Sequence, residues 1–170
     1  MTLDEFNSLP TEKAEAALLD CCASARWAAQ VNAQRPFVNV ESLYETADTC
    51  WRNLKREDWL EAFSHHPQIG EKPASGSASA RQWAAGEQSG ARTATDDMKA
   101  KLAEGNRAYF EKFGYIYIVC ASGKSAEEML ALLEQRYQND SARELPVAVE
   151  QQRQITRLRL EKLLAKGRTS

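Results

Sequence analysis

Residues 141–166 read SARELPVAVEQQRQITRLRLEKLLAK, and this stretch decides the class of fold. At 100° per residue, six of its side chains fall on one face: Leu145, Val149, Gln152, Ile155, Arg159 and Leu163. The period predicts a long amphipathic helix from about Ala142 to Lys166. Ser141 and Glu144 have the spacing of a capping box, which would satisfy the free backbone donors of its first turn.

The rest of the chain shows the same helical period. Leu43, Ala47, Trp51 and Leu54 form a second apolar stripe, and Asn39 is placed to cap its start. Similar signals predict six further helices. One opens at Pro10-Thr11, a second contains Ala28 and Val31 and ends before Pro36, and a third contains Trp59 to Phe63. After a loop from Gly70, a fourth spans about Ser79 to Gln88, a fifth runs from Thr95 to a terminating Gly114, and a sixth opens at a capping box at Ser125.

One segment departs from this period. Residues 115–121 read YIYIVCA, a composition typical of a β-strand, but no second strand is predicted that could pair with it. We therefore expect a buried extended segment rather than a sheet. The prediction is an all-α, bundle-like fold of about eight helices, with residues 1–170 as a single domain.

The composition excludes several classes of protein. The chain has 22 basic and 24 acidic residues and no long run of one sign, so a nucleic-acid partner is not expected. It opens MTLDEF, without a signal peptide, and contains no run of roughly 18 apolar residues that could cross a membrane. We expect a cytoplasmic protein with no membrane contact. Its four cysteines lack CxxC spacing and are expected to be reduced thiols.

The only histidines, His65 and His66, stand directly before Pro67. Imidazole exchanges a proton near neutral pH without a large shift of its pKa. The proline disfavours helical geometry at His66, so a helix should end here and present the ring from a loop. The alternative is a purely structural role, in which His65 interacts with the negative end of the helix dipole.

Two further residues break the expected pattern. Arg159 lies inside the apolar stripe of the last helix, and a buried guanidinium needs an anion or a strong acceptor beside it. Glu87 lies one turn from Trp83, and a carboxylate on an apolar surface suits proton transfer. The alternative for Arg159 is a side chain that extends to water or forms an ion pair with a structural carboxylate. The alternative for Glu87 is an exposed helical glutamate.

Two other apparent motifs fail on inspection. Residues 122–125, SGKS, imitate the end of a phosphate-binding loop, but Ile118 stands where that loop requires glycine. Adjacent histidines rarely face one ion, and no HxxxH pair or carboxylate-rich ligand set accompanies them. We therefore expect neither a phosphate site nor a metal site.

Four segments resemble, in order and spacing, the 2-oxo-4-hydroxy-4-carboxy-5-ureidoimidazoline (OHCU) decarboxylases of urate degradation. They are HHPQIG at 65–70, GEQ at 86–88, FGYIYIV at 113–119 and ITRLRL at 155–160. The match covers nearly the whole chain. It implies an all-α, cofactor-free homodimer that converts a small ureidoimidazoline to (S)-allantoin, with a functional link to urate oxidase and hydroxyisourate hydrolase.

The resemblance also implies the role of each matching residue. His66, Glu87 and Arg159 match the catalytic positions. The substrate-binding positions are Pro67, Ala84, Glu87, Gln88, Ile118, Val119, Cys120, Ser122 and Arg159. The segment from Ile118 to Ser122 would contact the substrate largely through its backbone. At Ala84 family members often carry serine, so a hydroxyl contact there is absent or replaced.

The competing class is a helical scaffold without catalytic activity. A scaffold predicts that His66, Glu87 and Arg159 are scattered and solvated, whereas an enzyme predicts that they surround one cavity. Their chemistry suits a decarboxylase, because an imidazole, a carboxylate and a guanidinium can stabilise developing charge and supply protons. The residues leave open which of His66 and Glu87 moves which proton.

Overall fold

The computed structural model describes residues 1–73 and 76–165, and within them it has nine α-helices, one 3-10 helix and no β-strand. The helices are α1 (Leu3–Asn7), α2 (Thr11–Cys21), α3 (Ala25–Asn32), α4 (Val40–Arg52), α5 (Arg56–Ser64), α6 (Ala78–Glu87), η1 (Ser89–Ala91), α7 (Asp96–Phe113), α8 (Ala126–Tyr137) and α9 (Ser141–Ala165). The all-α class is confirmed. The predicted end at Lys166 and part of the predicted loop, Ala74 and Ser75, lie outside the described residues.

The element that sequence analysis missed is α1. Thr2 caps it, accepting from the N–H of Glu5, while the Glu5 carboxylate accepts from the N–H of Thr2 at 2.7 Å. This reciprocal capping box was present in the sequence as T-x-x-E and could have revealed the helix. Among the described helices, none is both long and apolar enough to cross a bilayer.

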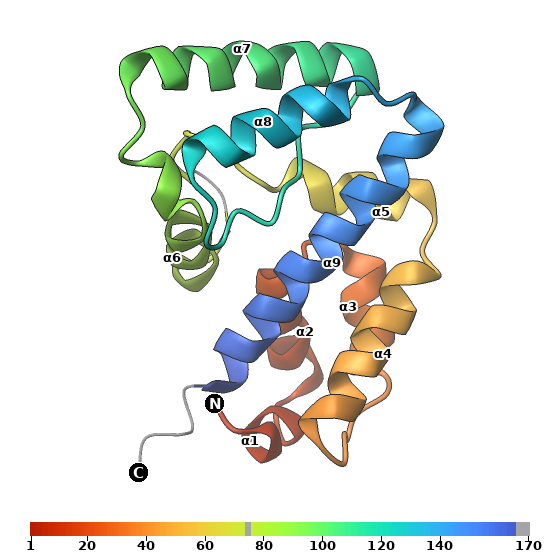
Figure 1. Cartoon of the computed structure of the whole chain (residues 1–170). Helices are drawn as coiled ribbons and strands as arrows, with labels where there is room; N and C mark the ends of the chain where they lie inside the picture. The colour runs from red at the N-terminus through yellow and green to blue at the C-terminus, as the bar shows by residue number, and fades with distance from the viewer. Residues whose placement is uncertain (74–75, 166–170) are drawn as a thin grey trace. The chain divides into compact units, whose positions relative to one another are not determined.

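The chain forms two compact units. The first contains residues Met1–Ala62 and the chain from Arg153, and the second contains Phe63–Gln152. In the first unit α3 packs against α2 and α4, as Figure 1 shows. The buried Trp27 indole donates to the carbonyl of Ala47 at 3.0 Å, which fastens α3 to α4. The predicted cap of α4 is confirmed, since Asn39 accepts from the N–H of Ser42 at 2.8 Å.

In the second unit α7 and α8 lie side by side (Figure 1). Gly105 permits this approach, because a Cβ there would lie 2.9 Å from Leu133 Cδ2. The helix α7 ends where predicted, at Gly114 with φ +82°. Residues 116–121 then run as an irregular, mostly buried segment with no strand assignment, so the expected burial and the expected lack of a sheet at this place are confirmed.

The predicted capping box at Ser141 is wrong. The side chain of Asp140 accepts from the N–H of Arg143 at 2.8 Å, so Asp140 caps α9. Glu144 does not turn back to the helix terminus. It is fully buried, and its carboxylate is taken up by a network of long-range contacts that the local pattern could not show.

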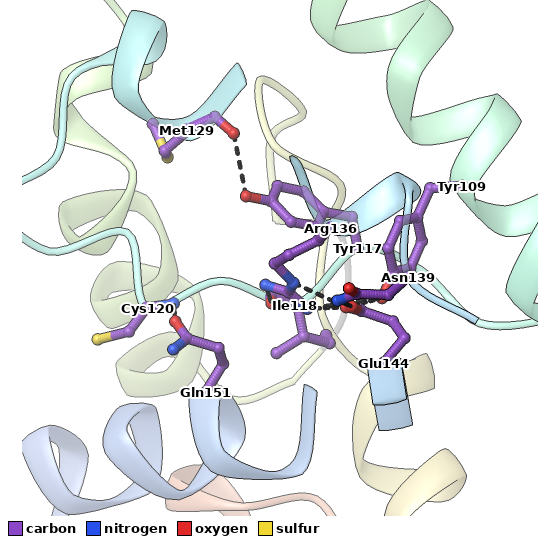
Figure 2. A network of polar contacts seen from close by, with 9 residues as sticks. All are labelled: Tyr109, Tyr117, Ile118, Cys120, Met129, Arg136, Asn139, Glu144 and Gln151. Carbon is purple, nitrogen blue, oxygen red and sulfur yellow. Dashed lines mark hydrogen bonds and ion pairs between the residues drawn. The ribbon is translucent and has the colours of Figure 1, made fainter. Parts of the chain in front are cut away.

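This network is drawn in Figure 2. One oxygen of Glu144 accepts from the Tyr109 hydroxyl at 2.6 Å and from Arg136 Nε at 2.7 Å, and the other accepts from Asn139 at 3.0 Å. The Arg136 guanidinium also lies 4.9 Å from the ring centroid of Tyr117. A single buried carboxylate thus joins α7, α8 and the start of α9.

The first prediction concerns the stability of this unit. Arg136→Met should lower the free energy of unfolding by about 3–5 kcal/mol, because it leaves the buried Glu144 carboxylate without its counter-ion. The measurement is urea unfolding followed by tryptophan fluorescence. The control is the same substitution at the exposed Arg143, which should change stability by about 0.5 kcal/mol or less. Equal losses in the two variants would contradict the account.

Candidate functional site

The two histidines occupy different environments. The helix α5 ends at Ser64, and the N–H of His66 closes the turn by donating to the carbonyl of Phe63 at 3.2 Å. His65 is exposed, whereas His66 is half-buried and its Nε2 lies 2.6 Å from Oε1 of Gln152 on α9. The prediction that a loop presents His66 is therefore confirmed.

The loop that carries His66 is fastened at its far end. The N–H of Gly70 donates to Oε1 of Gln88 at 3.0 Å, and the Asn106 amide donates to the carbonyl of Ile69 at 3.4 Å. The bond to Gln88 brings the end of α6 against the loop. Because its oxygen is used there, the Gln88 amide retains its NH2 group as a donor.

Glu87 is the last residue of α6 and is only 7% exposed. Ala84, one turn earlier, is also buried, so the expected placement of the carboxylate on a buried face is confirmed. A buried carboxylate at the C-terminal end of a helix is unfavourable both for its desolvation and for its interaction with the helix dipole.

Side chains hold the backbone of the extended segment. Arg136 Nη1 donates to the carbonyl of Ile118 at 2.6 Å, and the N–H of Cys120 donates to Oε1 of Gln151 at 2.8 Å (Figure 2). Lys124 Nζ donates to the carbonyl of Cys120 at 2.7 Å. These backbone groups are therefore engaged within the protein. Val119 lies between the two residues whose backbone is held in this way.

A close backbone approach lies between η1, which follows α6, and Lys124, which follows the extended segment. A Cβ added to Gly90, just after Gln88, would lie 2.1 Å from the carbonyl oxygen of Lys124. Contacts within the second unit therefore connect three parts of the chain. The His66 loop bonds to Gln88, and Gly90 lies against Lys124, which bonds to Cys120. Cys120 bonds to Gln151, whose neighbour Gln152 contacts His66. His66, Gln88 and Cys120 take part in these contacts, and Pro67, Glu87 and Val119 are their neighbours in the sequence. Ser122 is exposed.

Arg159 belongs to the first unit. It is 7% exposed, so its predicted position on the buried face of α9 is confirmed. The buried stripe of α9 differs from the predicted one near its ends. Val149 and Leu163, which were predicted on the buried face, are half-buried, and their neighbours Ala148 and Leu164 are buried instead. Arg157, two positions before Arg159, is half-buried and keeps contact with solvent. Its guanidinium lies 3.6 Å from the ring centroid of Tyr44, which gives it a packing role.

The thiol beside Arg159 is not a nucleophile. Burial raises the pKa of Cys22 from 9.0 to about 12, and contacts with Thr156 and Ser24 and the charge of Arg159 offset this only in part. A protonated thiol cannot attack an electrophile. The Cys22 thiol therefore stays protonated at neutral pH, which is unfavourable for a nucleophile.

The described residues contain no group of three or more His, Cys, Asp or Glu side chains that could hold a metal ion. The SGKS segment does not form a phosphate loop either, since Lys124 uses its ammonium on the carbonyl of Cys120. The groups available to a ligand are thus an imidazole, a carboxylate, an amide and peptide groups.

Residues 7–161 match the family model described as OHCU decarboxylase. The chain belongs to the OHCU decarboxylase family. A relative, the uric acid degradation bifunctional protein TTL of Arabidopsis thaliana, is 39% identical over 85% of this chain, which spans only 45% of the length of that relative. The 2-oxo-4-hydroxy-4-carboxy-5-ureidoimidazoline decarboxylase of Haloferax volcanii is 24% identical, with 94% of each protein covered.

Solved structures of the family agree with this fold. A crystal structure of OHCU decarboxylase in the presence of (S)-allantoin superposes with a TM-score of 0.77 and 36% identity, over 88% of this chain and 98% of that one. An (S)-allantoin synthase structure has the same fold, with a TM-score of 0.74 and 19% identity. It covers 96% of this chain and 54% of that one.

Several residues that shape the site escaped sequence analysis. Gln151, Arg136 and Asn106 carried no signal, because their partners lie 18 to 37 positions away in the chain. Gln152 was placed correctly on the buried face of its helix, but its contact with His66 spans 86 positions. Polar residues on a predicted buried face were the only clue.

The second prediction concerns the thiol next to Arg159. Between about pH 9 and 12 the unfolded chain loses the Cys22 proton while the folded protein keeps it, so stability falls as pH rises. Cys22→Ala should remove up to about 1.4 kcal/mol per pH unit from that slope. The measurement is urea unfolding at several pH values. The two proteins should show the same pH dependence between about pH 6 and 8, and identical slopes above pH 9 would contradict the assignment.

Proposed function

We propose that this protein is a cofactor-independent carboxy-lyase that decarboxylates 2-oxo-4-hydroxy-4-carboxy-5-ureidoimidazoline to (S)-allantoin. The observation that carries the proposal is the held imidazole: His66 is oriented by Gln152 at 2.6 Å in a loop that Gln88 fastens to α6. Membership of the family and the likeness to a decarboxylase structure obtained with (S)-allantoin support it.

The decarboxylation needs a group that accepts the electron pair of the broken carbon–carbon bond and a group that supplies a proton. When the bond to the carboxylate breaks, its electron pair passes into the ring towards the adjoining imine nitrogen, and carbon dioxide leaves. The hydroxyl on the former carboxyl-bearing carbon then gives up its proton and becomes a ring carbonyl of allantoin, and a proton delivered from one face to the neighbouring ureido-bearing carbon sets the configuration. His66 and Glu87 are the groups that we propose exchange protons with the substrate, and the order of their transfers is left open.

The remaining predicted residues would bind and orient the ring. We propose that Gln88 donates its amide NH2, that Val119, Ile118 and Ser122 offer backbone groups, and that Pro67 and Ala84 contact the ring. Cys120, whose N–H and carbonyl are already bonded to Gln151 and Lys124, would contact the substrate through its side chain. Ala84 cannot supply a hydroxyl. Donors fixed before the substrate arrives need no reorganisation as charge develops.

Arg159 is proposed as the group that holds an anionic or carbonyl oxygen of the substrate. It is a buried guanidinium in the first unit, and its fork of donors suits two acceptors at once. We further propose that residues 1–170 act as a single domain, that the protein is a cytoplasmic homodimer, and that urate oxidase and hydroxyisourate hydrolase supply its labile substrate. Bifunctional relatives named for uric acid degradation support the link to that pathway.

The third prediction tests the activity itself. With urate oxidase and hydroxyisourate hydrolase generating the substrate in place, the protein should accelerate the appearance of the circular dichroism of (S)-allantoin, and exhaustive chelation should not abolish this. His66→Asn should lower the rate by about 10²- to 10⁴-fold, the usual contribution of a positioned acid or base. Spontaneous decay, measured without the protein, is subtracted.

The matched control is His65→Asn, which removes the exposed neighbouring ring and should leave turnover unchanged. If the wild-type protein gives only the racemic product of spontaneous decay, the proposed function is wrong. If His65→Asn is the inactive variant, the assignment of the two histidines is reversed.

The fourth prediction separates the arginines of α9. Arg159→Lys keeps the charge but loses the planar fork, and should lower kcat/KM by roughly 10- to 100-fold, the value of a hydrogen bond to a charged group. Arg157→Lys should leave kcat/KM within about twofold, because its ion pairs are partly exposed. It should cost some stability, since the guanidinium stacks on Tyr44. Equal losses of turnover would show that Arg159 does not contact the substrate.

A further inference from the structure

Gln152 is the fully buried neighbour of His66. Its Oε1 lies 2.6 Å from Nε2 of the imidazole, across 86 positions of the chain. Building on the proposed function, we infer that Gln152 is a positioning residue that selects one tautomer of His66. The ring then carries its proton on Nε2 and presents Nδ1 to the substrate as the nitrogen that exchanges the catalytic proton.

The amide oxygen of Gln152 determines which nitrogen of the His66 ring carries a proton. A carbonyl oxygen only accepts hydrogen bonds, so a contact of 2.6 Å between Oε1 and Nε2 requires a hydrogen on Nε2. A neutral imidazole with its proton on Nε2 has its lone pair on Nδ1. The bond also restricts rotation of the His66 ring, because rotation would break it and remove the imidazole N–H from the buried oxygen of Gln152.

An amide is a different partner from the carboxylate that orients histidine in many hydrolases. A carboxylate favours the charged imidazolium, whereas a neutral amide orients the ring without adding charge. Gln152 would therefore fix the direction of His66 and leave its proton affinity to the substrate and the other groups of the site.

The residue before Gln152 extends this role. Gln151 accepts from the N–H of Cys120 at 2.8 Å (Figure 2), so consecutive glutamines of one helical turn hold the extended segment and the imidazole. Side chains of adjacent helical residues diverge by about 100°. A single rigid turn of α9 thus sets the spacing between His66 and the peptide groups at 118–120.

The first half of the test observes the ring proton directly. In protein labelled with ¹⁵N-histidine, above the titration range of the ring, Nε2 of His66 should be the protonated nitrogen and should show a hydrogen-bonded N–H resonance. The His65→Asn variant assigns the signals, since it leaves one histidine. Gln152→Met, which is similar in size and has no oxygen, should lose this resonance, and Gln152→Glu should retain it because the acceptor remains.

The second half measures turnover. Gln152→Met should lower kcat by about 10- to 100-fold with KM within about threefold, as expected when an orienting partner is lost but binding groups remain. Gln152→Glu should recover part of that kcat. The matched control is Gln135→Met on the exposed face of α8, which should retain wild-type kcat.

Each result bears on a different claim. A wild-type ring with its proton on Nδ1, or an unchanged kcat in Gln152→Met, would overturn the positioning role. If the ring resonance behaves as expected but the wild-type protein produces no (S)-allantoin, the proposed function fails while the hydrogen bond stands. Loss of kcat in Gln152→Met and Gln152→Glu alike would show that an acceptor oxygen at this position does not restore turnover, which would also overturn the inference.

Discussion

The carboxylate of Glu144 is the group on which the second compact unit depends. It has no exposure to solvent, and an isolated charge in that position would cost several kcal/mol. Tyr109, Arg136 and Asn139 together satisfy it, so three helical segments are fixed by a single group. Arg136 has a further N–H available and uses it on the carbonyl of Ile118. The buried ion pair thereby holds a peptide group of the candidate site as well as the fold.

This arrangement explains how an extended segment persists in an all-α protein. Buried peptide groups without a sheet partner must find other hydrogen bonds, and here side chains supply them. Arg136, Gln151 and Lys124 serve the backbone at Ile118 and Cys120, while apolar side chains of the segment enter the core. Side chains from two helices fix the segment more selectively than a β-ladder would, because only chosen peptide groups are engaged.

Local features of the structure could be predicted from the sequence because their signals are local. The cap at Asn39 and the left-handed terminator Gly114 depend on residues within one turn. Glu144 shows where such reasoning fails: its spacing from Ser141 fits a capping box, yet its partner Tyr109 lies 35 positions away. Glu87 and Arg159 were found because polar groups interrupted apolar patterns, and His66 because it is a histidine directly before a proline. The contact that Gln152 makes with His66 is tertiary and has no local signal.

We propose that a small ligand binds beside the ring of His66, between the loop fastened by Gln88 and the peptide of Val119. A crystal structure of this protein with bound (S)-allantoin tests it most directly. The account predicts the product within hydrogen-bonding distance of His66 Nδ1, the Gln88 amide and the backbone at Val119, with Gln152 still on Nε2. Density for the product at a place where it contacts none of these groups would contradict the account.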